Sequence, residues 1–312
     1  MIPAFGLSPR GSLFYSLTGD GVLRVWNARD GSRQAASQAD SMDRMALGLD
    51  GSTAVIPNAQ AMLEVWDVRD GELLRTVPGT WENEWLAYAS TTTLAVLQPE
   101  GSLAIVDLQT GEALDRLELK SYGGPAYFAL GSDGRNYAHM ALLAGRISLQ
   151  LYGMAPDLPL LDLGRYPRPS RPVFSPDGQM LAVVNRDRVL LWNLQSGALR
   201  RELQGLGSSV GPLTFTPDGS RLIAGSGEIW DVGSGARTAQ FETNSPDQRV
   251  ACNGYLIVGE QGNLWDASSG ASLGALAELR GPALNFEFTP DGSRLLWQVQ
   301  DGVVEVWGVS PE

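Results

Sequence analysis

Residues 171–199, RPVFSPDGQMLAVVNRDRVLLWNLQSGAL, decide the fold of this chain. Two short apolar runs, 181–184 and 189–192, flank a polar segment at 185–188, and a Pro-Asp-Gly turn precedes the first run. This pattern predicts a meander of short antiparallel strands. The same plan returns at 283–309 (ALNFEFTPDGSRLLWQVQDGVVEVWGV) and at 213–235 (LTFTPDGSRLIAGSGEIWDVGSG), so the stretch is one copy of an internal repeat.

The repeat spacing predicts the architecture. Each unit has a residue, usually an aromatic, that is expected to end its third strand: Trp26, Trp66, Val106, Tyr152, Trp192, Trp230, Trp265 and Trp307. Successive differences of 40, 40, 46, 40, 38, 35 and 42 define eight units of about 40 residues, the period of four-stranded propeller blades. We therefore expect an all-β chain forming a single eight-bladed β-propeller domain over 1–312. Its expected blades are 1–40, 41–80, 81–120, 121–164, 165–205, 206–243, 244–279 and 280–312.

The last unit is expected to have three strands, because the sequence given ends soon after its third apolar run. Val303, Val304 and Val306 would then lie on an outer edge strand, a surface open to self-association or to another chain. The alternative is that the tail 309–312 or a neighbouring molecule simply covers this edge.

Trp-Asp steps followed by glycine, as at 65–71 (VWDVRDG) and 229–235 (IWDVGSG), together with the Phe-Ser/Thr-Pro-Asp-Gly turns, resemble the WD-repeat family of β-propellers. The resemblance implies a non-enzymatic platform that binds a protein or peptide partner and needs no cofactor. The family's Gly-His dipeptide is absent from every unit. Without that histidine, we expect the packing between blades to rely more on apolar contact.

Composition narrows the functional classes. A net charge of −12 and a pI near 4.6 disfavour nucleic acid or an anionic membrane as the main partner. No apolar run approaches the roughly 20 residues needed to cross a bilayer, so we expect a soluble protein. No signal peptide is visible, so we expect a cytoplasmic protein, the alternative being that the sequence is that of a processed form. The single histidine, His139, falls in an expected second strand, and the single cysteine, Cys252, is expected in the core. These two residues alone make neither a catalytic triad nor a zinc site, so we expect no metal.

The alternative function is a propeller enzyme, or a binder of a small ligand or metal, with carboxylates lining a central channel. Acids that the repeat does not explain are the candidates for such a channel: Glu82, Glu84, Glu100, Glu260 and Asp301. They could bind Ca²⁺ through oxygen ligands, although no Asp-x-Asp-x-Asp-Gly loop accompanies them.

The predicted partner surface consists of the loops that join one blade to the next, because irregular loops with aromatic and arginine residues supply binding hot spots. The candidate residues are Trp81, Glu82, Tyr122, Arg165, Tyr166, Arg168 and Arg171. The three arginines form the densest basic group, which favours an acidic peptide, a carboxylate or a phosphate. In the alternative interpretation, Trp85 begins a first strand and Trp81 only covers a blade.

Overall fold

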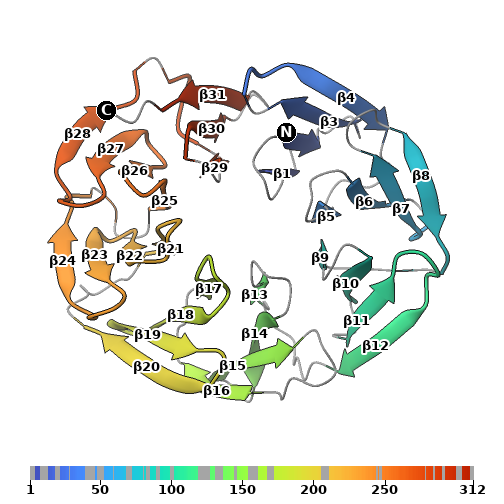
Figure 1. Ribbon diagram of the computed structural model, residues 1–312, viewed down its shortest axis with the longest axis horizontal. Coiled ribbons are helices and arrows are strands. Elements are labelled where there is room, and N and C mark those ends of the chain that lie inside the picture. Colours follow the sequence, from blue (N-terminus) through green and yellow to red (C-terminus); the bar gives the residue numbers. More distant parts are fainter. Residues whose placement is uncertain are drawn as a thin grey trace. The chain divides into compact units, whose positions relative to one another are not determined.

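The computed structural model describes residues 4–7, 13–17, 22–27, 29–38, 46–47, 53–58, 60–67, 72–79, 81, 85–88, 92–98, 102–118, 127–130, 136–143, 146–153, 161–166, 172–204, 211–243, 245, 248–277, 279–283, 285–289, 292–299 and 304–309. Within these ranges every regular element is a β-strand, and each strand pairs antiparallel with its neighbour (Figure 1). The chain divides into two compact units: Met1–Leu119 together with Ala283–Glu312, and Lys120–Pro282.

The described strands form eight sheets, seven of four strands and one of three. Four sheets belong to the unit that contains both chain ends. The first sheet is β1 (Ala4–Leu7), β2 (Leu13–Leu17), β3 (Val22–Asn27) and β4 (Arg33–Gln38). The second is β5 (Ala46–Leu47), β6 (Thr53–Pro57), β7 (Leu63–Asp67) and β8 (Leu73–Val77), and the third is β9 (Trp85–Tyr88), β10 (Thr93–Leu97), β11 (Ser102–Asp107) and β12 (Ala113–Glu118). The eighth is β29 (Asn285–Phe288), β30 (Arg294–Gln298) and β31 (Val304–Gly308).

The other unit contains the remaining four sheets. The fourth sheet is β13 (Tyr127–Leu130), β14 (Asn136–Leu143), β15 (Arg146–Gly153) and β16 (Leu161–Tyr166). The fifth is β17 (Val173–Phe174), β18 (Met180–Asn185), β19 (Arg188–Asn193) and β20 (Ala198–Leu203). The sixth is β21 (Leu213–Phe215), β22 (Arg221–Ala224), β23 (Glu228–Asp231) and β24 (Arg237–Gln240), and the seventh is β25 (Val250–Cys252), β26 (Leu256–Gly259), β27 (Asn263–Asp266) and β28 (Ser272–Ala275).

The repeated aromatic lies on the third strand as predicted, but at its penultimate residue, because the strand continues for one residue beyond the expected end. In β3, β7, β19, β23, β27 and β31 this residue is a tryptophan. A feature that the sequence did not predict accompanies it. The pairing with the fourth strand shifts by one residue just before the aromatic in the first, second, fifth, sixth and seventh sheets, and just before Val106 in the third. A β-bulge at this point bends the outer strand and increases its local twist.

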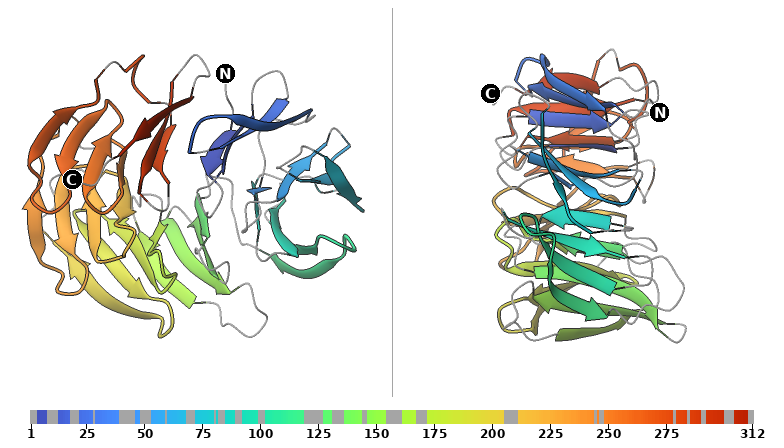
Figure 2. Two further views of the ribbon diagram at one scale, coloured as in Figure 1. Left: turned by 45° about the horizontal axis from the view of Figure 1, so that its top comes forward. Right: turned by 90° about the vertical axis from the view of Figure 1, so that its right-hand side faces the viewer.

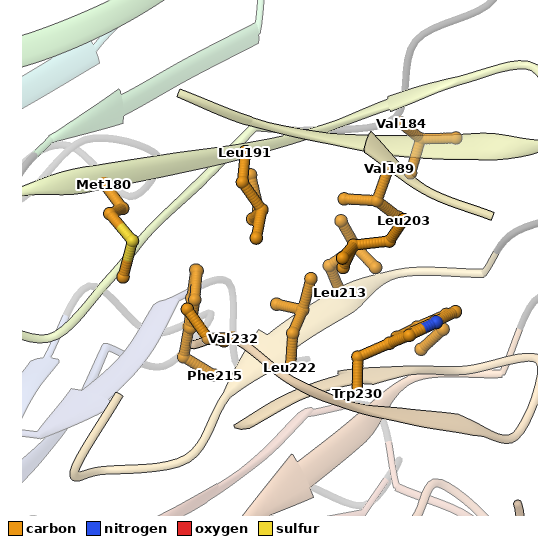
Figure 3. Packing of buried hydrophobic residues seen from close by; sticks show 12 residues of the cluster. Met180, Val184, Val189, Leu191, Leu203, Leu213, Phe215, Leu222, Trp230 and Val232 are labelled. Atoms are coloured by element: carbon orange, nitrogen blue, oxygen red, sulfur yellow. The ribbon is translucent and has the colours of Figure 1, made fainter. Parts of the chain in front are cut away.

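Apolar side chains fill the space between neighbouring sheets of one unit. Figure 3 shows the cluster between the fifth and sixth sheets, where Leu191 and Leu203 face Leu222 and Trp230. Neighbouring first strands also approach each other, as β13, β17, β21 and β25 do in succession, and the sheets of this unit follow one another in the same order in Figure 2. In the other unit β1 approaches β29, and Trp26 packs with Leu296, so the first and last sheets adjoin.

One expected boundary needs correction, and the expected packing between sheets needs an addition. The expected boundary between residues 164 and 165 falls inside β16, so the fourth sheet extends to Tyr166. The packing between sheets also uses polar links: the Arg201 guanidinium donates to the Gly233 carbonyl of the next sheet, and Arg221 Nη1 donates to the Ala267 carbonyl at 3.1 Å. Arginine side chains therefore add hydrogen bonds to the apolar contact that the sequence predicts between sheets.

The tryptophans of the third strands differ in their hydrogen bonding. Trp26 Nε1 donates to Ser16 Oγ at 3.0 Å in the first sheet. The indole N–H groups of Trp66, Trp192, Trp230 and Trp307 are buried and have no hydrogen-bond partner in the structure. A buried donor without a partner costs about 1–3 kcal/mol, so these positions lower the stability of their sheets.

Candidate functional site

In the sixth and seventh sheets, one end carries two turns, between the first and second strands and between the third and fourth strands. Backbone hydrogen bonds join these turns: Val232 N donates to Ser220 O at 2.9 Å in the sixth sheet, and Ala267 N donates to Tyr255 O at 2.7 Å in the seventh. The turns of a sheet therefore support one another, and side chains on them project from a braced backbone.

The turn between the third and fourth strands is capped by the residue that follows the aromatic. In the seventh sheet, Asp266 Oδ1 accepts hydrogen bonds from the backbone N–H groups of Ser268 and Ser269, and Asp266 O accepts one from Gly270 N. The Ser268 and Ser269 hydroxyls also donate to this carboxylate and lower the pKa of Asp266 to about 2. Gly270 has a φ of +72°, a backbone conformation that favours glycine.

The Pro-Asp-Gly turn between the first and second strands has a similar construction. In the sixth sheet, Thr216 Oγ1 accepts from Arg221 N at 3.0 Å and donates to Asp218 Oδ1 at 2.6 Å. These bonds lower the pKa of Asp218, with the Thr216 hydroxyl contributing most and the Ser220 N–H next. Both carboxylates, Asp218 and Asp266, are therefore ionised at neutral pH.

The seventh sheet departs from this plan. Its first turn is shorter and reads Asn253-Gly254-Tyr255, where other units have Pro-Asp-Gly. Asn253 Oδ1 accepts from Tyr255 N at 3.0 Å and from Leu256 N at 2.8 Å. The Tyr255 side chain is 76% exposed, the largest exposure among the large apolar and aromatic side chains that the structure describes as exposed. The turn thus holds the backbone of an aromatic residue in place while its side chain faces solvent.

Neighbouring turns complete this surface. A Cβ placed on Gly254 would lie 3.9 Å from Cδ of Pro217, so the turns of the sixth and seventh sheets are in contact. We use the name Tyr255 surface for six residues of these turns: the exposed Pro217, Asp218, Tyr255, Ser268 and Ser269, and the partly buried Asp266. It combines an exposed aromatic side chain with the carboxylates of Asp218 and Asp266.

The structure describes three of the seven predicted partner residues: Trp81, Arg165 and Tyr166. Trp81 is only 7% exposed; it packs with Val77 and Leu94, and its Nε1 donates to Pro78 O at 3.0 Å. This burial fits the alternative interpretation, as does Trp85, which begins β9. Arg165 and Tyr166 lie on the outer strand β16 and not in a loop. The remaining predicted partner residues lie outside the described residues: Glu82, Tyr122, Arg168 and Arg171.

The predicted edge and channel residues are partly described. Val304 and Val306 lie on β31, the last strand of the eighth sheet, whereas Val303 lies outside the described residues. Of the five candidate channel acids, Glu260 is described; it is partly exposed and pairs with Arg249 at 3.8 Å. Glu82, Glu84, Glu100 and Asp301 lie outside the described residues.

Three other residues bear on chemistry. Cys252 is buried in the core of the seventh sheet, where burial raises the pKa of its thiol to about 11. His139 lies on β14, the second strand of its sheet, as predicted. Glu287 lies on the first strand β29, where desolvation by the surrounding protein raises the pKa of its carboxyl to about 7. Its side chain is exposed, however, so water screens part of this effect.

Sequence reasoning missed Tyr255 and Glu287. A signal existed for both: the Asn-Gly dipeptide at 253–254 replaces the regular turn, and Glu287 stands between two phenylalanines in a strand. Among the described residues, no group of three or more His, Cys, Asp or Glu side chains is placed to hold a metal ion. In that same part of the chain, we find no helix with the length and apolar character needed to span a membrane.

Comparison with known proteins gives a likeness of fold. No family model matches the chain, and no curated protein matches its sequence. The crystal structure of the computationally designed Ika8 protein is similar, with a TM-score of 0.70 at 19% sequence identity. The match covers 99% of this chain and 96% of that one. At this identity the likeness concerns the fold alone, an all-β arrangement of small antiparallel sheets.

Proposed function

We propose that the chain is an eight-bladed β-propeller of the WD-repeat type. Support comes from the eight described sheets, the recurring aromatic and bulge on the third strand, and the contact between the first and last sheets. In this arrangement each sheet is a blade, its first strand is the innermost, and the contact between β1 and β29 closes the ring without a strand shared between the chain ends.

The function we propose is non-enzymatic binding of a protein or peptide partner on this scaffold. The observation that carries the proposal is Tyr255, 76% exposed on a turn whose backbone is held by Asn253. An exposed tyrosine supplies a large contact area, and its preformed turn lowers the conformational entropy lost on binding. Tyrosine is also one of the residues that most often dominate interface energies.

The charge of the Tyr255 surface defines the chemistry of the partner. Asp218 and Asp266 keep their negative charge at neutral pH, and the net charge of the chain is −12. A complementary partner would combine an apolar pocket for the tyrosine ring with basic residues around it. The loops predicted from sequence, with Arg168 and Arg171, remain a second candidate surface for an acidic partner.

The test is affinity capture with chemical crosslinking, comparing wild type with Tyr255→Ala. The matched control is Leu273→Ala, since Leu273 is 57% exposed on β28 of the same sheet but lies outside the Tyr255 surface. We expect a specific partner that crosslinks near Tyr255 and is lost from Tyr255→Ala only. Capture that is equal in all three proteins, at unchanged thermal stability, would overturn this assignment of the binding surface.

Glu287 favours a second candidate function, which is binding of a small ligand or an enzymatic activity at carboxylates on the first strands. A carboxyl with a raised pKa on a first strand is the kind of group that binds a ligand or transfers a proton. A thermal-shift screen would separate the two functions. A compound that stabilises wild type but not Glu287→Gln would favour this candidate over the platform.

A further inference from the structure

The outer edge of the eighth sheet differs from that of every other sheet. In each of the first seven sheets a fourth strand pairs with the third strand, whereas among the described residues no strand pairs with the outer edge of β31. Such an edge leaves the backbone donors and acceptors along one side of the strand available for another chain.

In the same unit, β7 has a sequence similar to that of β31, and its outer edge is paired with the fourth strand β8. β7 reads Leu63-Glu64-Val65-Trp66-Asp67 and β31 reads Val304-Glu305-Val306-Trp307-Gly308. In β7, which is covered by β8, Leu63 is 0% exposed and Val65 is 1% exposed. The corresponding Val304 and Val306 of β31 are only partly buried. The eighth sheet therefore has apolar surface at the positions that a fourth strand helps to bury in the second sheet.

The pairing of β7 with β8 serves as a template for the missing strand. Val77 lies opposite Leu63, and Thr76 lies opposite Glu64. Arg75 lies opposite Val65, and after the bulge Leu73 lies opposite Trp66. Transferred to β31, this register places an aliphatic residue opposite Val304, a small polar residue opposite Glu305 and a basic residue opposite Val306.

We propose that β31 accepts an extended segment of a partner protein as a fourth, antiparallel strand, with the pattern aliphatic, aliphatic, basic, small polar, aliphatic. Main-chain hydrogen bonds to β31 supply affinity, and the alternate side chains supply specificity. A basic residue in the segment also suits a chain whose net charge is −12. This binding mode uses a different surface from Tyr255 and is independent of it.

The test uses a labelled peptide with the sequence of residues 71–78, Gly-Glu-Leu-Leu-Arg-Thr-Val-Pro, titrated with the full chain and followed by fluorescence anisotropy. The control peptide has proline in place of both Arg75 and Thr76, because proline cannot donate to a β-ladder and adjacent positions cover both sides of the strand. We expect saturable binding of the first peptide and at least tenfold weaker binding of the second. Equal binding of the two peptides would overturn the proposal.

Two further measurements locate the site. Hydrogen exchange should show that the first peptide protects amides within 304–308, and protection confined to another sheet would overturn the assignment. Val304→Lys should weaken binding at least tenfold, whereas Leu273→Lys on the outer strand β28 should not. Since Val304→Lys can also lower stability, a peptide with aspartate in place of Val77 tests the same contact from the other side.

The oligomeric state separates a partner protein from a second copy of this chain. We expect a monomer by light scattering at the concentrations of the titration. A dimer that Val304→Lys dissociates would identify a second copy as the occupant of the edge, and the proposal of a partner segment would then fail.

Discussion

The hydrogen bonding of Trp230 can be tested by a single substitution. Its Nε1 is buried without a hydrogen-bond partner, whereas the equivalent Trp26 donates to Ser16. Trp26 lies opposite Phe14, and Ser16 is two residues further along β2; Trp230 lies opposite Leu222, and the residue two positions further along β22 is Ala224. Ala224→Ser should therefore give the Trp230 indole the acceptor that it lacks.

The expected gain follows from the environment. Ala224 and Trp230 are both 0% exposed and belong to the same apolar cluster. A neutral hydrogen bond contributes a net ~0.5–1.5 kcal/mol, and it also relieves the cost of a buried donor without a partner. We expect Ala224→Ser to raise the free energy of unfolding by about 1 kcal/mol, measured by urea denaturation with the slope of the transition unchanged.

Two variants serve as controls for this prediction. Ser16→Ala should lower the free energy of unfolding by about 1–3 kcal/mol, because it removes the acceptor of Trp26. Ala95→Ser also buries a hydroxyl, but in the third sheet, where Val106 takes the place of the tryptophan, so it should destabilise. If Ala224→Ser destabilises as much as Ala95→Ser, the proposed equivalence between Ser16 and Ala224 is wrong.

Three further predictions concern other positions. Gly225→Ala should lower the free energy of unfolding by about 2 kcal/mol or more, measured by urea denaturation, because the new Cβ would lie 2.0 Å from the Gln248 carbonyl oxygen. Gly233→Ala is the control and should have little effect, since its Cβ would meet only a side-chain oxygen at 3.4 Å. Folding raises the pKa of Glu287 from 4.5 to about 7, so the free energy of unfolding of wild type should fall as pH rises across this range. Glu287→Gln should therefore be more stable than wild type at pH 8 but not at pH 4. If the free energies of unfolding of the two proteins change with pH in the same way, this prediction is wrong. The Cys252 thiol, buried and with a pKa raised to about 11, should resist iodoacetamide at pH 8 until the chain unfolds, and rapid labelling of the folded protein would refute its burial.

The sequence predicted the repeat well because turns and strands are local. The Pro-Asp-Gly and Ser-Gly pairs lie in turns whose glycines have positive φ, such as Gly219 and Gly235. The aromatic of each unit falls at the penultimate position of a third strand because the same short strand returns with nearly the same length. Local chemistry of this kind can be predicted without knowing how the sheets pack.

Features that depend on packing between elements could not be predicted in this way. Trp81 is flanked in sequence by the polar residues Thr80 and Glu82, which favours an exposed loop. The core between the second and third sheets nevertheless buries its side chain. The sequence predicts a blade-connecting loop at Arg165 and Tyr166, but pairing with β15 extends the strand β16 to Tyr166. The turn that carries Tyr255 has a local signal in Asn253-Gly254, but the contact of this turn with Pro217 depends on how the sixth and seventh sheets pack.

The contact between the first and last sheets tests the closed propeller most directly. In the structure Trp26 of β3 packs with Leu296 of β30. A double-mutant cycle with Trp26→Leu and Leu296→Ala measures the coupling free energy of the two side chains, and Leu296→Ala with Val96→Ala, whose residue lies in a separate cluster, is the control pair. We predict a coupling of about 0.5–3 kcal/mol for the first pair and below about 0.5 kcal/mol for the control. A coupling near zero for Trp26 and Leu296 would contradict closure of the ring through these two sheets.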